Sequence, residues 1–139
     1  MKMLEILCVI DDDKIFTFLL KRIIEKAKIA REIIFFENGR DALDYLAKYK
    51  EDALKLPQLI LLDINMPILD GWQFLQEYGN LKPSVPQPIS ICMMSSSADV
   101  EDYDRAMDSG HVMDYLQKPV LMPSLMEISE RVLTFLGSK

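Results

Sequence analysis

Runs of continuous apolar residues alternate along this chain with stretches in which apolar residues recur every three or four positions. The first pattern is typical of strands in a parallel sheet covered on both faces, and the second of helices that bury one side. The apolar runs predict five strands, at residues 4–10, 32–36, 59–62, 89–94 and 113–117. The periodic stretches predict five helices, at about residues 14–27, 40–50, 72–78 and 100–108 and from residue 123 onward. The alternation predicts an α/β fold, a parallel sheet with helices on both faces.

The apolar spacing also predicts which side of the helices is buried. Asp13 is expected to cap the first helix, and Pro123 to open the last. The expected buried side chains are Ile15, Phe16, Leu19, Leu20, Ile23 and Ile24 in the first helix, Val100, Tyr103, Ala106 and Met107 in the fourth, and Leu125, Ile128, Val132 and Phe135 in the fifth.

Composition narrows the class of protein. The 139 residues suit one domain, and half of them are hydrophobic, which is enough for a core. Sixteen basic against 22 acidic residues give a net charge of −6, which argues against direct nucleic-acid binding. No apolar run approaches the roughly 20 residues of a membrane span. Cys8 and Cys92 lie in strand-like runs without metal-ligand spacing, so we expect reduced core cysteines in a cytoplasmic protein.

Polar side chains gather where the predicted strands end. Ligands of an open parallel sheet bind outside the carboxyl ends of its strands, so these residues are expected to meet there. They are Asp11, Asp12 and Asp13 after the first strand, Asp63 and Asn65 after the third, Ser95, Ser96 and Ser97 after the fourth, and Lys118 and Pro119 after the fifth. The set contains carboxylates, hydroxyls and one ammonium group, but no histidine or thiol.

Clustered carboxylates repel one another and are stable together only with a cation among them. Oxygen ligands with room for water suit Mg²⁺ better than zinc. An Asp carboxylate beside Mg²⁺ and a Lys ammonium is poised to attack a phosphoryl group, because the two cations offset the negative charge that would repel phosphate. The residues alone therefore suggest an acidic site that handles phosphate.

Each residue also has an ordinary explanation. Asp11 and Asp12 fit a solvated strand end, Asp63 fits a turn before Met66-Pro67, and Lys118 fits the protein surface. His111, the only histidine, is assigned no role.

The chain resembles the receiver domain of two-component response regulators, especially the single-domain, chemotaxis-regulator type. The motifs that carry the resemblance are Ile10-Asp11-Asp12-Asp13, Leu61 to Pro67, Leu69-Asp70-Gly71, Met94 to Ser97 and Tyr115 to Pro119. The resemblance implies a flavodoxin-like, doubly wound (βα)5 fold with strand order 2-1-3-4-5. It also implies that residues 1–139 form one receiver domain with no output domain.

In metal and phosphoryl chemistry, the resemblance implies the following roles. Asp63 accepts a phosphoryl group from a sensor histidine kinase, a histidine phosphotransfer protein or a small donor. Asp12 binds Mg²⁺ directly, Asp11 acts mainly through metal-bound water, and Asn65 adds its backbone carbonyl. Such a domain is not an enzyme beyond its own phosphorylation and dephosphorylation. Asn65 and Ser97 occupy positions that tune the lifetime of the phosphoryl group in relatives.

The resemblance also implies a switch. Lys118 and the Ser95 hydroxyl bind phosphoryl oxygens, Tyr115 turns inward when Ser95 moves, and the bond before Pro119 is cis. A face formed by helix four, strand five and helix five then gains or loses an unknown downstream protein. The structural alternative for Tyr115 is a strand aromatic with its hydroxyl in water.

The spacing departs from the family pattern in one place. Gly110 and Lys118 are eight positions apart where the family usually has seven, so we expect a bulge within residues 111–113. Counting back from Lys118 would assign the hydroxyl to Ser96, but the strand pattern favours Ser95. Leu121 replaces a common capping residue, so the last helix is expected to begin late.

Two other functions remain open. One is a phosphatase with an aspartyl-phosphate intermediate, of the haloacid-dehalogenase type, although Asn65 stands where that chemistry generally needs a second Asp. The other is a receiver-like scaffold that works without phosphorylation.

Overall fold

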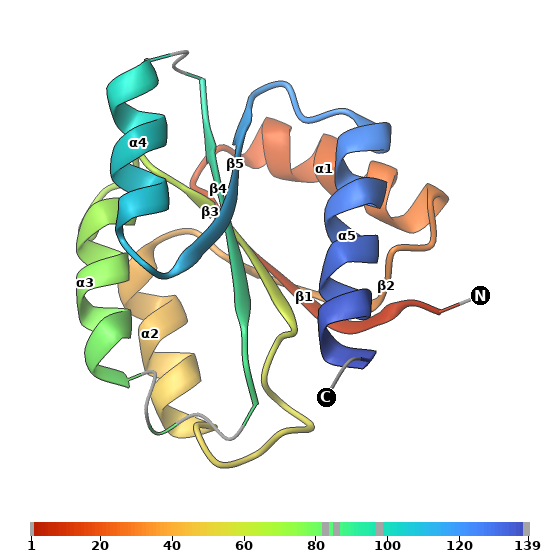
Figure 1. Ribbon diagram of the computed structural model, residues 1–139, viewed down its shortest axis with the longest axis horizontal. Coiled ribbons are helices and arrows are strands. Elements are labelled where there is room, and N and C mark those ends of the chain that lie inside the picture. Colours follow the sequence, from red (N-terminus) through yellow and green to blue (C-terminus); the bar gives the residue numbers. More distant parts are fainter. Residues whose placement is uncertain (1, 82–83, 85–86, 97–98, 138–139) are drawn as a thin grey trace.

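Five parallel strands form one sheet in the order β2-β1-β3-β4-β5, as the computed structural model shows for residues 2–81, 84, 87–96 and 99–137 (Figure 1). The strands are β1 (Leu4–Ile10), β2 (Ala30–Phe36), β3 (Leu59–Asp63), β4 (Ser90–Ser95) and β5 (Val112–Gln117). The predicted fold class and strand order are confirmed.

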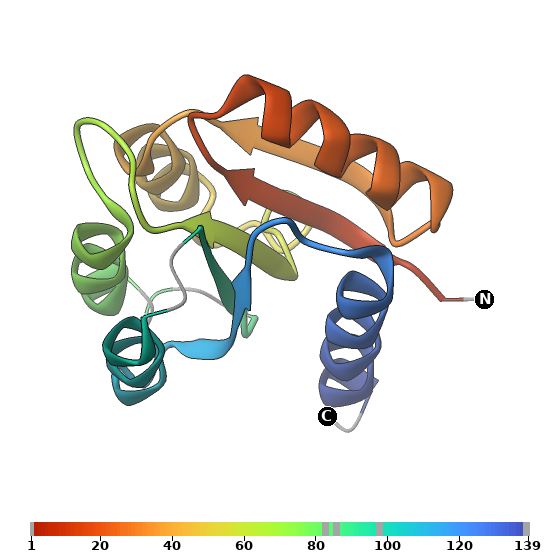
Figure 2. The ribbon, with the colours of Figure 1, turned by 90° about the horizontal axis from the view of Figure 1, so that it is seen from above.

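Helices cover both faces of the sheet (Figure 2). They are α1 (Lys14–Lys26), α2 (Gly39–Lys48), α3 (Gly71–Leu81), α4 (Val100–Asp108) and α5 (Met122–Gly137). Residues of α1 and α5 share one core cluster, and residues of α2, α3 and α4 share the other. The sheet lies between them, since all five residues of β3 are buried and so are six of the seven in β1.

Short polar residues start four of the helices, and at the start of α3 the Asp70 carboxylate accepts a hydrogen bond from the Gln73 N–H (2.8 Å). The Asp13 carboxylate accepts a hydrogen bond from the Phe16 N–H (3.0 Å), and Asn38 accepts one from Asp41 (2.9 Å). Asp99 does the same for Glu101. Because Asp13 directly follows two of the candidate site residues, its cap begins α1 beside the site. Among the described residues, no helix is both long enough and apolar enough to cross a membrane.

The predicted buried sides of three helices are partly wrong. On α1, Ile15 and Leu19 are exposed (76% and 53%). The other exposed side chains of the predicted set are Val100, Tyr103 and Met107 on α4 and Phe135 on α5. The reason is geometric: a helix on a sheet buries only the side chains that point at the sheet, and those on its flanks stay in solvent.

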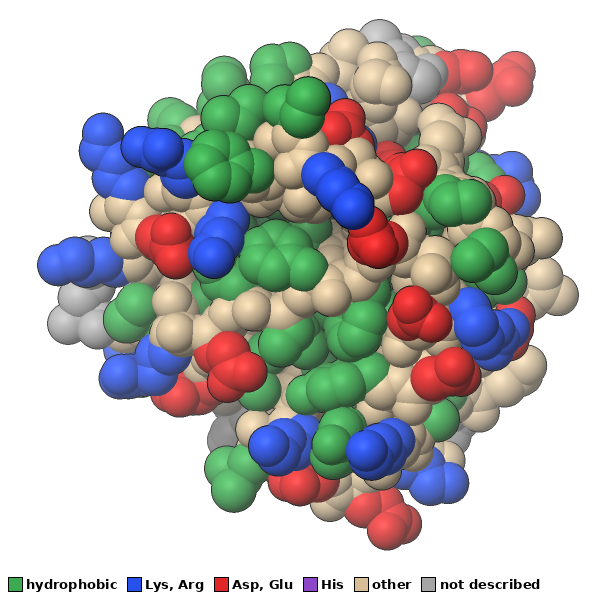
Figure 3. Space-filling model, turned by 180° about the vertical axis from the view of Figure 1, so that it is seen from behind, with side chains coloured by type: hydrophobic (Ala, Val, Ile, Leu, Met, Phe, Trp, Pro, Cys, Tyr) green, Lys and Arg blue, Asp and Glu red, His purple; other side chains and the backbone are tan. Residues whose placement is uncertain are grey.

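The exposed side of α1 combines apolar and basic side chains. Ile15, Phe18 and Leu19 are exposed there, and so are Lys14 and Arg22. Seen from behind, the molecule shows such a mixture at its upper left (Figure 3).

The expected bulge in β5 is confirmed. Ile91 pairs with Val112 whereas the next residue, Cys92, pairs with Asp114, so Met113 is the additional residue. Beyond it the register is regular, and Ser95 pairs with Gln117. The extra residue is therefore absorbed before the strand reaches the site.

Candidate functional site

Three carboxylates converge at the carboxyl ends of two neighbouring strands. Asp11 and Asp12 follow β1, and Asp63 is the last residue of β3, the strand that pairs with β1. One carboxylate oxygen of each lies within 4.8 Å of the others. Asp11 and Asp63 are buried, whereas Asp12 is exposed. The site is thus open to solvent on the Asp12 side.

The Lys118 ammonium reaches this cluster from the end of β5. Its Nζ lies 2.8 Å from an Asp11 oxygen and 3.3 Å from an Asp63 oxygen. The ammonium also lies 4.3 Å from the centre of the Phe16 ring, a cation–π contact. The Lys118–Pro119 peptide bond is cis. The ammonium is thus held between two carboxylates and an aromatic ring.

Sequence reasoning did not find the part that Phe16 plays. It placed Phe16 only in the buried stripe of α1, because nothing in the residue's spacing relates it to a lysine about 100 positions away. Its position three residues after the capping Asp13 is the one signal that it lies near the site.

Burial and repulsion determine the ionisation of the site. Desolvation, and then the charge of Asp11, raise the pKa of Asp63 from 3.8 to about 6, although Lys118 opposes the shift. Burial alone would lower the pKa of Lys118, but its contacts with Asp11 and Asp63 outweigh this and raise it. One ammonium therefore faces three carboxylates, and the cluster keeps an excess of negative charge.

These donors fit a divalent cation. Mg²⁺ prefers oxygen ligands, and the carboxylates of Asp11, Asp12 and Asp63 are close enough to share one ion. Burial, and then the negative charge of Asp11, raise the pKa of Asp63 in spite of Lys118. A bound cation would supply the missing positive charge.

The remaining candidates belong to β3, β4 or β5 or follow these strands in the sequence. Ser95 is fully buried at the end of β4, and its carbonyl accepts a 2.7 Å hydrogen bond from the Lys118 N–H. Ser96 is exposed, and Ser97 lies outside the described residues. Asn65 is exposed in the loop after β3. Tyr115 is partly buried in β5, with its ring edge-on to Tyr103 of α4 at 6.0 Å.

Gly71 fixes the loop that carries Asp63 to the start of α3. Its N–H donates to the Ile64 carbonyl (2.8 Å), and a Cβ at this position would lie 2.7 Å from the Asp63 carbonyl oxygen and 2.9 Å from the Ile64 Cα. These contacts are with backbone, which cannot rotate away. The close approach explains why glycine is needed here.

We therefore expect Gly71→Ala to lower the free energy of unfolding by about 2 kcal/mol, because the methyl group would push the Asp63 segment out of place. Urea denaturation measures the change. Gly137→Ala is the matched control, since its methyl group would meet no packing neighbour within 4 Å, and it should change stability by less than ~0.5 kcal/mol. Equal effects of the two substitutions would contradict the packing argument.

Comparison with known proteins agrees with this geometry. The chain matches the family model of the response regulator receiver domain over residues 7–130. It is 29% identical over 127 residues to the probable methanogenesis regulatory protein FilR2 of Methanothrix harundinacea, covering 91% of this chain and 80% of FilR2. It spans only 25% of the matching DNA-binding transcriptional regulator NtrC of Escherichia coli.

Solved structures show the same architecture. A two-component response regulator from Cytophaga hutchinsonii is 29% identical and superposes with a TM-score of 0.87, covering 96% of this chain and 99% of that one. The receiver domain of the sensor histidine kinase PA1611 of Pseudomonas aeruginosa, whose active-site cleft holds a magnesium ion, has a TM-score of 0.75 at 18% identity, over 94% of this chain and 98% of that one. Family model and fold together show that the chain belongs to the response regulator receiver domains of two-component systems.

Proposed function

We propose that this receiver is a phosphoacceptor and that Asp63 takes the phosphoryl group. The observation that carries the proposal is the position of the Asp63 carboxylate, which is buried at the end of β3 beside Asp11 and lies 3.3 Å from the Lys118 ammonium. A carboxylate oxygen attacks phosphorus and forms an O–P bond. The N–P bond of a phosphohistidine breaks, its electron pair returns to the imidazole nitrogen, and that nitrogen regains a proton.

The other site residues act on charge and position. Asp11, Asp12, Asp63 and the backbone carbonyl of Asn65 would hold Mg²⁺, which supplies positive charge opposite the phosphoryl oxygens. Lys118 binds one phosphoryl oxygen, for which its ammonium already lies 3.3 Å from Asp63. Ser95 lies at the end of the neighbouring strand, and its hydroxyl donates a hydrogen bond to another phosphoryl oxygen.

Phosphorylation then changes the surface around α4. The added negative charge draws Ser95 toward the phosphoryl group, and Tyr115 follows and leaves its contact with Tyr103. Exposed Val100 and Tyr103 belong to the face of α4, β5 and α5 that a downstream protein recognises. The phosphoryl donor on this proposal is a sensor histidine kinase or a histidine phosphotransfer protein, and the receiver acts in the cytoplasm through contacts with proteins and not with nucleic acid.

The direct test is incubation with acetyl phosphate, with and without Mg²⁺, followed by intact-mass measurement. We expect one phosphoryl group per chain, formed only with Mg²⁺ and lost slowly. Aryl phosphates should not be hydrolysed over many turnovers. Sustained hydrolysis would favour a phosphatase, and no uptake despite measurable Mg²⁺ binding would favour a scaffold.

A further inference from the structure

Helix α4 is weakly anchored to the rest of the domain. Ala106 is its only buried residue, whereas α2, α3 and α5 bury four residues each. Its larger apolar side chains, Val100, Tyr103 and Met107, are exposed. Burial of apolar surface is the main source of docking energy, so individual side-chain contacts weigh heavily in fixing the position of α4.

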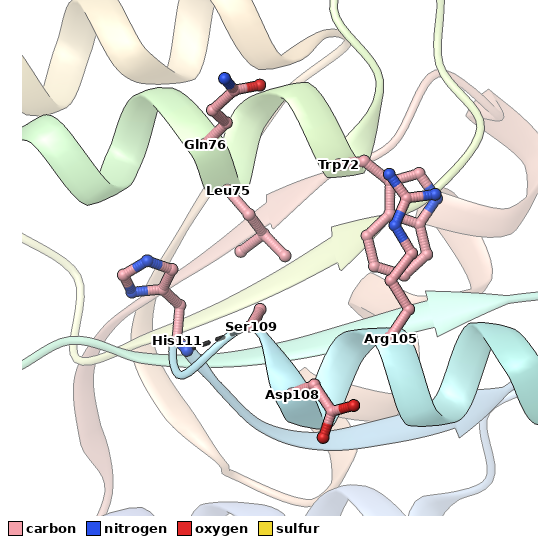
Figure 4. Close-up of a pocket in the computed structure, with 7 residues that line it drawn as sticks. All are labelled: Trp72, Leu75, Gln76, Arg105, Asp108, Ser109 and His111. Atoms are coloured by element: carbon pink, nitrogen blue, oxygen red, sulfur yellow. Dashed lines mark hydrogen bonds between the residues drawn. The ribbon is translucent and has the colours of Figure 1, made fainter.

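One such contact joins α4 to α3. The guanidinium carbon of Arg105 lies 4.1 Å from the centre of the Trp72 ring, a close cation–π stack. Figure 4 shows the pair at one end of a groove between the two helices, with His111 at the other end. The groove has a volume of about 470 Å³ and is also lined by Leu75 and Asp108. The Arg105 side chain therefore crosses from α4 to α3 at one end of this groove.

Trp72 is directly connected to the phosphoacceptor segment. It follows Gly71, whose backbone packs against the Asp63 carbonyl and is hydrogen-bonded to Ile64. On its other side α4 contacts β5 through the rings of Tyr103 and Tyr115. Two aromatic contacts thus hold α4, one to the Asp63 segment and one to the proposed switch residue.

We propose that the Arg105–Trp72 stack is a latch that positions α4 in the unphosphorylated domain and opposes its activation. This inference rests on the proposed function. On this proposal the stack is formed in the inactive conformation and broken in the active one, so removing it shifts the population toward the active conformation. A variant without the stack must then bind ligands that mimic the phosphoryl group more tightly than the wild type does. The ratio of the two affinities equals the factor by which the stack favours the inactive conformation.

The first test measures α4 itself. In Arg105→Ala, amide hydrogen exchange over residues 100–108 should become faster, while exchange in α3 and α5 stays unchanged. Arg31→Ala removes the same charge from an exposed site on β2 and should behave like the wild type. Unchanged exchange in α4 of Arg105→Ala would overturn the latch.

The second test measures binding of Mg²⁺ and beryllofluoride by ¹⁹F NMR titration. Arg105→Ala should bind beryllofluoride about threefold to fivefold more tightly than the wild type, and Arg105→Lys, which keeps a cation over the ring, should lie between them. Trp72 is the only tryptophan, so its fluorescence should respond to the ligand in the wild type and respond less in Arg105→Ala.

The outcomes separate the latch from the proposed function. Wild-type binding with unchanged affinity in a folded Arg105→Ala variant would overturn the latch alone. Absence of binding in the wild type would contradict the phosphoacceptor role and the latch with it. Circular dichroism establishes that the variants are folded.

Discussion

Asp63→Asn is expected to abolish phosphoryl uptake from acetyl phosphate and, at pH 7 without Mg²⁺, to stabilise the fold by about 1–2 kcal/mol. Function is lost because an amide has no nucleophilic carboxylate oxygen. Stability increases because the ionised Asp63 is buried beside Asp11, and asparagine keeps the shape without the charge. The shift of the Asp63 pKa from 3.8 to about 6 corresponds to at most ~3 kcal/mol, and partial solvation of the pocket reduces this value.

The stability gain should depend on pH. The folded protein binds the Asp63 proton more tightly than the unfolded chain, so ionisation of Asp63 destabilises the fold as pH rises from about 4 to about 6. The difference between Asp63→Asn and the wild type should be small below pH 4 and complete above pH 6. Urea denaturation at several pH values measures it. A difference that stays constant from pH 4 to pH 7 would contradict the electrostatic explanation.

Mg²⁺ should reduce the difference in stability between Asp63→Asn and the wild type. A ligand that binds only the folded state stabilises it, so millimolar Mg²⁺ should raise the stability of the wild type more than that of Asp63→Asn. Equal effects of Mg²⁺ on both proteins would exclude Asp63 as a ligand.

Lys118→Ala is expected to weaken beryllofluoride binding about 10- to 100-fold in the presence of Mg²⁺, because a charge-assisted hydrogen bond to the ligand is lost. The same change should lower the free energy of unfolding by about 2 kcal/mol. It removes the cation that lies 2.8 Å from Asp11 and 3.3 Å from Asp63, and leaves both buried carboxylates without it. Asp63→Asn and Lys118→Ala thus both impair the site but change stability in opposite directions.

The matched control is Lys14→Ala. Lys14 lies near the site at the start of α1, but its side chain is 84% exposed and its partner Glu37 is 3.5 Å away in solvent. Exposed ion pairs contribute little, so the change in stability should stay below ~0.5 kcal/mol and ligand binding should be nearly unchanged. A similar loss in both variants would mean that overall charge, and not the position of Lys118, controls binding.

The strands and the acidic cluster could be predicted because both depend on short, continuous segments of the sequence. Buried parallel strands are apolar throughout, so β1 and β3 stand out in the sequence, and strand ends in such a sheet must share one edge. This brings Asp11 and Asp63 together without any knowledge of side-chain positions. The roles of Ser95 and Tyr115 came from family resemblance and stay predictions.

The surfaces of the helices could not be predicted in the same way. The spacing of Val100, Tyr103 and Met107 suits a buried stripe, but how much of it is buried depends on the angle and distance at which α4 lies on the sheet. Contacts between distant segments are hidden for the same reason. Phe16 contacts Lys118, and Trp72 contacts Arg105. Neither pair is related by a helix or strand repeat, so no pattern in the sequence predicts these contacts.

The additional residue at Met113 determines how this chain should be aligned with shorter homologues. A gap opposite Met113 is expected to keep Tyr115, Gln117 and Lys118 matched to their counterparts in the family and to assign the phosphoryl-binding hydroxyl to Ser95, which is buried. An ungapped alignment anchored at Lys118 would instead assign that hydroxyl to the exposed Ser96. We therefore expect residue correspondences transferred to this protein upstream of β5 to hold only when the gap is placed within the strand.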